Sequence, residues 1–450
     1  MTSVGSITPN SSYTPFTTST PSSESVPAWS LSARVAFRLC VVYFGLYVIS
    51  TQMLAALFPT PGIELPDLSA IPAVQSLFAW IGAHILGIAE PIAQHVSGSG
   101  DKLFDWVQSF SLVLIAIIAT AIWSIVSKRE HHTRLYRWFR LFARFALGTT
   151  LISYGIAKAI PMQMPILALA RLVEPFGNFS PMGVLWYSVG AAPAYEVITG
   201  CAELTAGILL FWPRTATLGA LLALMDMTMV FILNMTYDVP VKLFSFHLVV
   251  LSIVIIAPNA KRLFELFVLH RSTAIREEPA FGRVPATNRR AIVAQLLFAA
   301  YVLSVNVYQG ADSWTKFGAG APKSPLFGIW DITDMSIDGQ AHPALLTDRD
   351  RFHRLIFQQP AFATIQQMDD TFKRYGAVID TVKHTLELSA TDTTKTKALL
   401  TYRRATPQQL VIDGTMGGHV MHLDATVRDL NSFLLRNRGF HWVQELPFNR

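Results

Sequence analysis

Long apolar runs fill the first two thirds of the chain, and short alternating runs fill the last third. A hydrocarbon core about 30 Å thick needs roughly 20 mainly apolar residues in a helix that crosses it. Runs of about this length recur seven times, which predicts an α-helical polytopic membrane bundle with about seven spans. The predicted spans lie near 33–57, 105–126, 140–160, 192–211, 215–235, 241–257 and 291–309.

One further apolar stretch, residues 71–89, contains His84 and is flanked by prolines. If this stretch crosses the membrane, the bundle has eight spans and the N-terminus lies outside. If it is re-entrant or interfacial, the bundle has seven spans and the N-terminus is cytoplasmic, as Arg34 and Arg38 indicate. We favour the seven-span arrangement.

In the last third of the chain the pattern changes to the period of two that half-buried strands show. Within 419–427, for example, the apolar residues share one face and the polar residues share the other. The apolar face holds Met421, Leu423, Ala425 and Val427, and the polar face holds His422, Asp424 and Thr426. This alternation predicts an antiparallel β-barrel or closely curled sheet over 325–450. The segment 360–375 is an exception, where we expect a helix. The alternating runs are 384–390, 398–404, 410–414 and 419–427, and the turn signals are Asp338-Gly339, Asp413-Gly414 and Gly417-Gly418.

Composition agrees with a membrane protein that carries a soluble module. The chain is 51% hydrophobic and 15% charged, whereas soluble domains average about 25% charged residues. We divide it into a disordered Ser/Thr/Pro-rich tail at 1–30, a transmembrane bundle at 31–310 and a soluble domain at 311–450.

The two cysteines and the net charge exclude several classes of function. Cys40 and Cys201 both lie in apolar segments, so the soluble domain has no disulfide, and their placement argues against dithiol chemistry. The net charge of +6 comes from Lys and Arg at the predicted membrane boundaries. It therefore does not indicate a nucleic-acid partner, and the lipid bilayer is the partner that it fits.

The distribution of Lys and Arg predicts the orientation, because positively charged loops stay in the cytoplasm. Fourteen Lys and Arg residues lie in 128–144, in 261–290 and at position 214, against four on the opposite side of the bundle. This predicts cytoplasmic loops at 128–139 and 258–290. The C-terminal domain then faces the periplasm or the extracellular side.

Ionisable and polar side chains inside spans are costly, so each one is a candidate for function. Most of those in the later spans fall in the outer third of the membrane, and we predict that they converge there into one site. Lys158 with Glu196, and Asp238 with Lys242, are the expected ion pairs, while Glu203 and Asp226 lie deeper. The candidate site consists of Lys158, Glu196, Glu203, Asn234, Asp238, Lys242 and His247.

A structural role is the alternative for each of these residues. Lys242 and Asp238 are close to span ends, where long side chains often extend to the interface. Glu203 and Asp226 can make hydrogen bonds that only hold the helices together. The cluster is therefore either a site or a structural lock.

Two motifs, in the predicted spans 140–160 and 192–211, resemble the DoxX-like membrane family. They are RFALG at 144–148 with YGIAK at 154–158, and ELTAGILL at 203–210 followed by Arg214. The spans in 140–257 match the four-helix core of that family, and YDVPVKLFS at 237–245 is similar to a longer subgroup. The resemblance implies a bacterial plasma membrane protein linked to redox or detoxification complexes, such as thiosulfate–quinone oxidoreductases. It also implies redox partner proteins and a quinone.

The soluble domain resembles lipocalin-type barrels at one motif. Gly328-Ile329-Trp330 is similar to the Gly-x-Trp start of such barrels, in which the tryptophan closes the floor and a late arginine packs on it. Arg436, Arg438 and Arg450 are the candidates for this arginine. The aromatic-rich stretch 438–445 is either a lid or floor of a pocket or a strand docked on the membrane.

Three functions fit these observations. The first is a redox-associated membrane protein that binds a quinone-type or other lipid-soluble ligand in the outer-leaflet site; as an enzyme it would be a membrane oxidoreductase subunit. The second is a non-enzymatic binder that captures an apolar small molecule in its lipocalin-like domain, and the third is a transporter or assembly factor. The sequence has no metal-ligand spacing, phosphate loop, nucleophile elbow or haem motif, so it assigns no catalytic residue and no metal.

Overall fold

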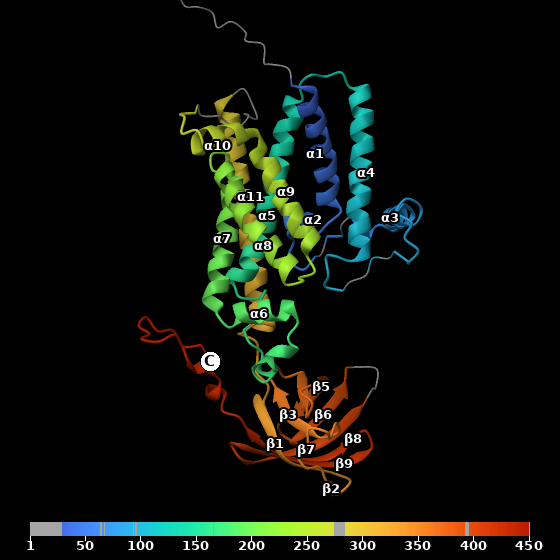
Figure 1. Ribbon diagram of the computed structural model, residues 1–450, viewed down its shortest axis with the longest axis vertical. Coiled ribbons are helices and arrows are strands. Elements are labelled where there is room, and N and C mark those ends of the chain that lie inside the picture. Colours follow the sequence, from blue (N-terminus) through green and yellow to red (C-terminus); the bar gives the residue numbers. More distant parts are fainter. Residues whose placement is uncertain are drawn as a thin grey trace, which may run out of the picture.

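A helical bundle and a β-barrel follow one another along the long axis of the molecule (Figure 1). The computed structural model describes residues 29–449 except 64, 67, 93, 95–96, 165, 274–283 and 392–395. The predicted disordered tail therefore lies outside the described residues up to position 28.

Six of the described helices are long and apolar enough to cross a membrane. They are α1, α4, α7, α8, α11 and the stretch Lys242–Phe267, which joins α9 to α10. The chain thus contains a polytopic membrane bundle, as predicted. The helices of the bundle are α1 (Leu31–Ile49), α2 (Met53–Leu57), α3 (Pro72–His84), α4 (Leu103–Val126), α5 (Thr133–Ala159), α6 (Pro181–Gly190), α7 (Pro193–Phe211), α8 (Ala216–Thr236), α9 (Lys242–Ile256), α10 (Ala260–Phe267) and α11 (Pro285–Lys316).

Helix α5 corresponds to the span predicted at 140–160, but it begins earlier and is not among these six helices. It runs alongside them through the bundle (Figure 1) and contacts α2, α7, α9 and α11. Its Arg140, Arg144 and Lys158 are all buried. Because neighbouring helices cover these charges, α5 can be more polar than a helix that faces lipid.

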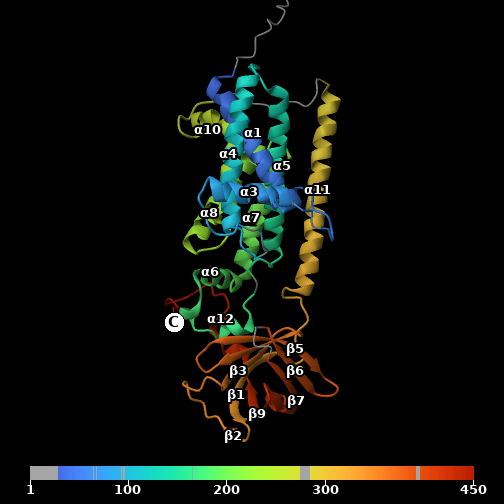
Figure 2. The same ribbon diagram turned by 90° about the vertical axis from the view of Figure 1, so that its right-hand side faces the viewer.

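The stretch 71–89 does not form a spanning helix. Only 13 of its residues are helical, in α3, and this length reaches about 20 Å at 1.5 Å per residue. Helix α3 lies across the direction of the long helices, seen end-on in Figure 1 and from the side in Figure 2. The arrangement agrees with the interfacial alternative. The span predicted at 33–57 is divided, since α1 ends at Ile49 and α2 starts at Met53.

The last third of the chain forms a closed eight-stranded antiparallel β-barrel. Neighbouring strands pair in chain order, and β1 pairs with β9 to close the barrel, while the two-residue β2 only extends one edge of β1. Met421, Leu423 and Ala425 face the buried core, which confirms the predicted alternation. The strands are β1 (Gly328–Ile337), β2 (Gln340–Ala341), β3 (Phe352–Phe357), β4 (Phe362–Gln367), β5 (Phe372–Asp380), β6 (Thr385–Ala390), β7 (Lys397–Thr406), β8 (Gln409–Met416) and β9 (His419–Val427).

The helix predicted at 360–375 is wrong, because this segment forms the hairpin of β4 and β5. Its turn contains Asp370, whose φ of 64° lies in the left-handed region. The alternation is hidden in the sequence because Gln366 and Gln367 are buried although they are polar.

One of the three predicted turns is also wrong. Asp338-Gly339 joins β1 to β2 and Gly417-Gly418 joins β8 to β9, but Asp413-Gly414 lies within β8. Gly414 has a φ of 152°, and a Cβ there would lie 2.4 Å from the carbonyl oxygen of Leu399 on β7. This glycine therefore allows close approach of a neighbouring strand and does not reverse the chain.

The tryptophan–arginine contact expected of a lipocalin-like barrel is present, but with a different arginine. Trp330 is 1% exposed and its indole N–H donates to the carbonyl oxygen of Leu326 at 2.9 Å. The guanidinium carbon of Arg404 on β7 lies 5.7 Å from the centre of the Trp330 ring. The predictions of Arg436 and Arg438 are wrong because both follow the last strand, at α12 (Leu434–Asn437) and just beyond it. Arg450 lies outside the described residues.

The barrel is attached to the bundle through the segment between α5 and α6. Leu169 of this segment is buried against Ile329 on β1 and Ile356 on β3. Its backbone N–H donates to the side-chain oxygen of Gln358 at 2.8 Å. These contacts join the outside of the barrel to the end of the bundle.

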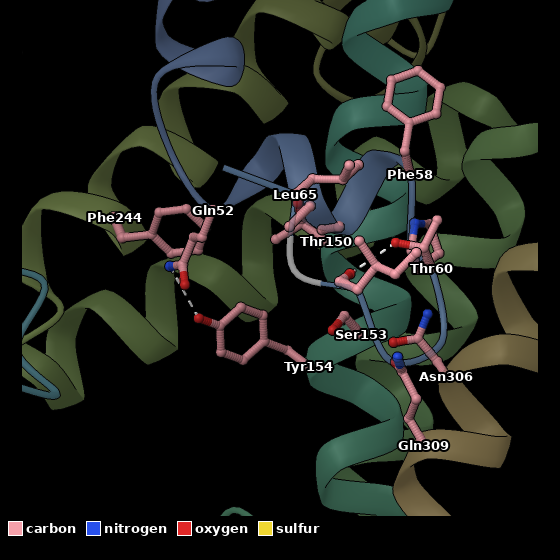
Figure 3. Close-up of a pocket in the computed structure, with 14 residues that line it drawn as sticks. Gln52, Phe58, Thr60, Leu65, Thr150, Ser153, Tyr154, Phe244, Asn306 and Gln309 are labelled. Atoms are coloured by element: carbon pink, nitrogen blue, oxygen red, sulfur yellow. Dashed lines mark hydrogen bonds between the residues drawn. The ribbon is translucent and has the colours of Figure 1, made fainter. Parts of the chain in front are cut away.

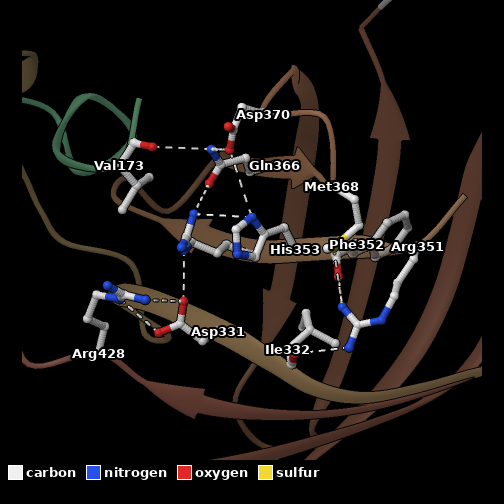
Figure 4. Close-up of polar contacts among 11 residues, drawn as sticks. Val173, Asp331, Ile332, Arg351, Phe352, His353, Gln366, Met368, Asp370 and Arg428 are labelled. Carbon is white, nitrogen blue, oxygen red and sulfur yellow. Dashed lines mark hydrogen bonds and ion pairs between the residues drawn. The ribbon is translucent and has the colours of Figure 1, made fainter. Parts of the chain in front are cut away.

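A polar network beside this apolar contact fixes the barrel further (Figure 4). Gln366 is fully buried and donates to the carbonyl oxygen of Val173 at 3.2 Å, while it accepts from Arg354 at 2.7 Å. Arg354 and Arg428 both donate to Asp331 at 2.8 Å. Burial alone would raise the pKa of Asp331, but the hydrogen bonds from the two arginines outweigh it and hold this pKa below its usual value.

Helices α5 and α7 pack with their backbones in close contact, because glycines face each other across the interface. A Cβ on Gly200 of α7 would lie 2.7 Å from the carbonyl oxygen of Gly155 on α5. A Cβ on Gly207 would lie 2.9 Å from the carbonyl oxygen of Gly148. Small residues at spacings of one or two turns are a common way for membrane helices to approach closely.

We predict that Gly200→Ala lowers the thermal stability of the detergent-solubilised protein. The new methyl group would lie 2.4 Å from the backbone nitrogen of Ala159, and such overpacking costs about 1–3 kcal/mol. Gly45→Ala on α1 is the matched control, because nothing lies within 4 Å of a Cβ there and Ala is favoured over Gly in a helix by roughly 0.5–1 kcal/mol. Equal melting temperatures for the two variants would contradict the close packing of α5 on α7.

Candidate functional site

A buried ion pair joins α5 to α7 inside the membrane bundle. The Nζ of Lys158 lies 2.5 Å and 2.7 Å from the two carboxylate oxygens of Glu203, and both side chains are at most 8% exposed. The predicted pairing of Lys158 with Glu196 is therefore wrong. Gly200 lies between the two glutamates, and the stem of Lys158 passes directly over it. The ammonium group thus reaches the deeper carboxylate.

Glu196 has a different role at the first turn of α7. It is 0% exposed, and its Oε1 accepts the backbone N–H of Met164 at 2.8 Å. This contact fixes the chain as it leaves α5. Its second oxygen, Oε2, has no hydrogen-bond partner among the described residues.

Asp226 extends the charged group onto α8. It is within electrostatic range of Glu203 and Lys158. Its Oδ2 is buried and forms no hydrogen bond with any described residue. One cation and two carboxyl groups from three neighbouring helices are therefore grouped within the bundle.

The predicted ion pair between Asp238 and Lys242 is confirmed, with 2.9 Å between Nζ and Oδ1. A residue that the sequence analysis missed, Asp101, holds this region together more firmly. Its carboxylate accepts the backbone N–H groups of Lys242 and Leu243 at 2.8 Å and 2.9 Å. Asp101 thereby satisfies free donors at the start of α9 from a segment about 140 positions away.

The remaining two candidates make contacts close to this region. Asn234 donates to the hydroxyl of Ser245 at 2.9 Å, which links α8 to α9. His247 contacts the hydroxyl of Tyr43 at 2.5 Å, and its ring stacks on that of Tyr47 with 3.9 Å between ring centres. The two tyrosines from α1 were missed because nothing in the sequence places α1 beside α9.

The seven predicted residues therefore form two groups and not one. Lys158, Glu203 and Glu196 form the group on α5 and α7, and the others form the group around the start of α9. Among the described residues, no hydrogen bond or ion pair connects the two groups. Tyr154 lies between them, with its ring centre 5.8 Å from the Nζ of Lys158 and 6.0 Å from the ring centre of Phe244.

Tyr154 also forms a wall of a pocket of about 300 Å³ (Figure 3). Polar side chains from α5, from α11 and from Gln52 and Thr60 on either side of α2 line this space, and Phe58 and Phe244 are among its apolar lining residues. The hydroxyl of Tyr154 accepts a hydrogen bond from the Gln52 amide at 3.2 Å, and no acceptor for its own proton is found among the described residues. The pocket is lined by Gln52, Ala55, Ala56, Phe58, Pro59, Thr60, Ile63, Leu65, Thr150, Ser153, Tyr154, Phe244, Asn306 and Gln309.

None of the known protein families has a model that matches the chain, and no solved structure matches it. A curated protein that it resembles is the uncharacterized protein YwoB of Bacillus subtilis (strain 168). The two are 25% identical over 154 residues, which is 32% of this chain and 84% of YwoB.

We predict that Lys158→Met strongly destabilises the bundle, because it leaves the Glu203 carboxylate buried without its partner. Removal of one member of a buried pair costs about 3–5 kcal/mol. The double variant Lys158→Met with Glu203→Leu should recover most of the loss in a thermal unfolding experiment in detergent. Lys316→Met is the control, because the Lys316–Asp312 pair is exposed and its loss should leave the melting temperature unchanged. A double variant no more stable than Lys158→Met alone would argue against the pair.

Proposed function

We propose that this chain is a multi-pass protein of a bacterial plasma membrane that binds a quinone-type ligand, as part of a redox system. The observation that carries the proposal is the polar-lined pocket beside Tyr154 inside an apolar bundle. The resemblance of 140–257 to the DoxX-like family, some of whose members are linked to thiosulfate–quinone oxidoreductases, points the same way.

The residues around the pocket fit the head group of such a ligand. A quinone ring is flat and apolar, and its two carbonyl oxygens accept hydrogen bonds. The Tyr154 hydroxyl and the amides of Asn306 and Gln309 are donors on the lining, and Phe58 and Phe244 offer apolar surfaces. A volume of about 300 Å³ is at the lower end for ligand pockets. It suits a head group whose isoprenoid tail remains in the lipid.

The Lys158–Glu203 ion pair lies beside Tyr154. Its ammonium group lies 5.8 Å from the Tyr154 ring, and charges act more strongly at the low dielectric of a membrane interior. A bound quinone supplies the redox chemistry. The chain itself orients a carbonyl oxygen and donates a hydrogen bond to it.

We predict that a quinone co-purifies with the protein in mild detergent and is identified by mass spectrometry. Tyr154→Phe should reduce the retained quinone by up to about tenfold, since a hydrogen bond of about 1.5 kcal/mol or less is lost. The purified Tyr154→Phe variant should also bind an added short-chain quinone more weakly than the wild-type protein in a titration.

Tyr308→Phe is the matched control, because Tyr308 is on α11 near Asn306 but is 65% exposed. This variant should retain the wild-type amount of quinone. Recovery of a fatty acid or another apolar molecule in place of a quinone would count against the proposal and favour capture by the barrel.

We further propose that the barrel faces outward from the cytoplasm. The support is the excess of fourteen Lys and Arg residues over four. The loop 128–132 and helix α10 also lie at the end of the bundle away from the barrel (Figure 1).

Fusion reporters test this orientation. Alkaline phosphatase fused after the last residue should be active in a bacterial host, because the enzyme matures only outside the cytoplasm. A green fluorescent protein fused at the same place should stay dark. The reverse pattern would place the barrel in the cytoplasm and would also reverse every loop assignment.

A further inference from the structure

The C-terminal segment, residues 434–448, exposes large apolar side chains. Trp442 is 91% exposed, Leu446 is 79% and Phe440 is 77%. From residue 438 to 449 the chain forms no helix or strand. Because contiguous exposed apolar groups are rare on soluble surfaces, they commonly mark a place of contact.

The start of this segment is fixed at the junction of barrel and bundle. Leu430 and Phe433 pack in the apolar cluster that contains Leu169 and Ile329. From this point the chain runs away from the barrel wall. In both views the end marked C lies on the barrel side of α6, between the barrel and the ends of the long helices (Figures 1 and 2).

The same end of the bundle carries exposed aromatic side chains. Tyr195 near the start of α7 is 57% exposed, and Phe317 just after α11 is 71% exposed. Aromatic residues gather where a membrane meets water, since their rings suit the head-group region. The C-terminal segment therefore lies next to this membrane surface, on its barrel side.

The charge of the segment fits a phospholipid surface. It carries Arg436 and Arg438 against one acidic residue, Glu445. The guanidinium carbon of Arg438 lies 4.7 Å from the centre of the Phe448 ring, so charged and aromatic groups are side by side. Guanidinium groups bind phosphate oxygens well, and aromatic groups enter the layer beneath them.

We propose that residues 434–448 bind the phospholipid surface on the barrel side of the membrane, with Trp442 and Leu446 in the head-group layer and the two arginines on lipid phosphates. The segment gives the barrel a second attachment beside the junction. This proposal depends on neither the quinone nor the direction in which the barrel faces.

The test uses the full-length chain with a fluorophore on the segment. Leu446→Cys, in a background with Cys40→Ser and Cys201→Ser, is labelled with the environment-sensitive dye NBD. The labelled protein is reconstituted into nanodiscs of POPC and POPG, with or without lipids that carry a nitroxide on the head group. We expect a blue-shifted emission that the nitroxide lipids quench strongly.

Leu346→Cys is the matched control. Leu346 is 77% exposed, and it lies in the connection that follows β2, the strand at the end of the barrel away from the bundle (Figures 1 and 2). Its label should emit as in water and remain unquenched. Arg436→Gln with Arg438→Gln should lower the quenching at position 446 in discs that contain POPG.

Two outcomes would overturn the proposal. A label at 446 that behaves like the label at 346 would show that the segment stays in water. A blue-shifted label that nitroxide lipids do not quench would show that protein covers the segment, either the bundle or a second copy. Size-exclusion profiles identical to wild type confirm that each variant is folded.

Discussion

The close crossing of α5 and α7 is the contact on which the rest of the bundle depends. Lipid tails are as apolar as the side chains, so helices in a membrane associate by close packing and by polar contacts. Gly155 and Gly200 allow the first, and Lys158 with Glu203 supplies the second. At the other end of the same interface, Arg144 donates to the carbonyl oxygens of Leu210 and Phe211 at 2.8 Å and 3.0 Å. Two buried cations thus fix both ends of one helix pair.

Local pattern was enough to predict the elements, because spans and strands each follow from a period in the sequence. The strand faces at Met421 and Leu423 and the long apolar helices needed no tertiary information. Errors arose where a polar group is buried with partners from elsewhere. Gln366 interrupts the alternation of β4 because it binds Arg354 and the Val173 carbonyl, and neither partner can be inferred from its neighbours.

The sequence identified the individual candidate residues better than it identified their partners or their arrangement in one site. A charged side chain inside a span is costly, and this marks Lys158 and Glu203 as candidates. The sequence does not show, however, that Gly200 leaves room for the Lys158 side chain to extend to Glu203 and not to Glu196. Asp238 and Lys242 were paired correctly because helical spacing alone brings them together. The pocket was missed for the opposite reason. Neither Gln52 nor Asn306 stands out in the sequence, and the two line one pocket only because α2 and α11 both pack on α5.

The barrel is connected to the bundle twice, covalently through α11 and non-covalently through Leu169 in the segment that follows α5. Helices α5 and α11 pack directly on each other, and both contribute residues to the pocket. The barrel is therefore attached at two points to one packed pair of helices, and this limits how freely it can tilt on the bundle.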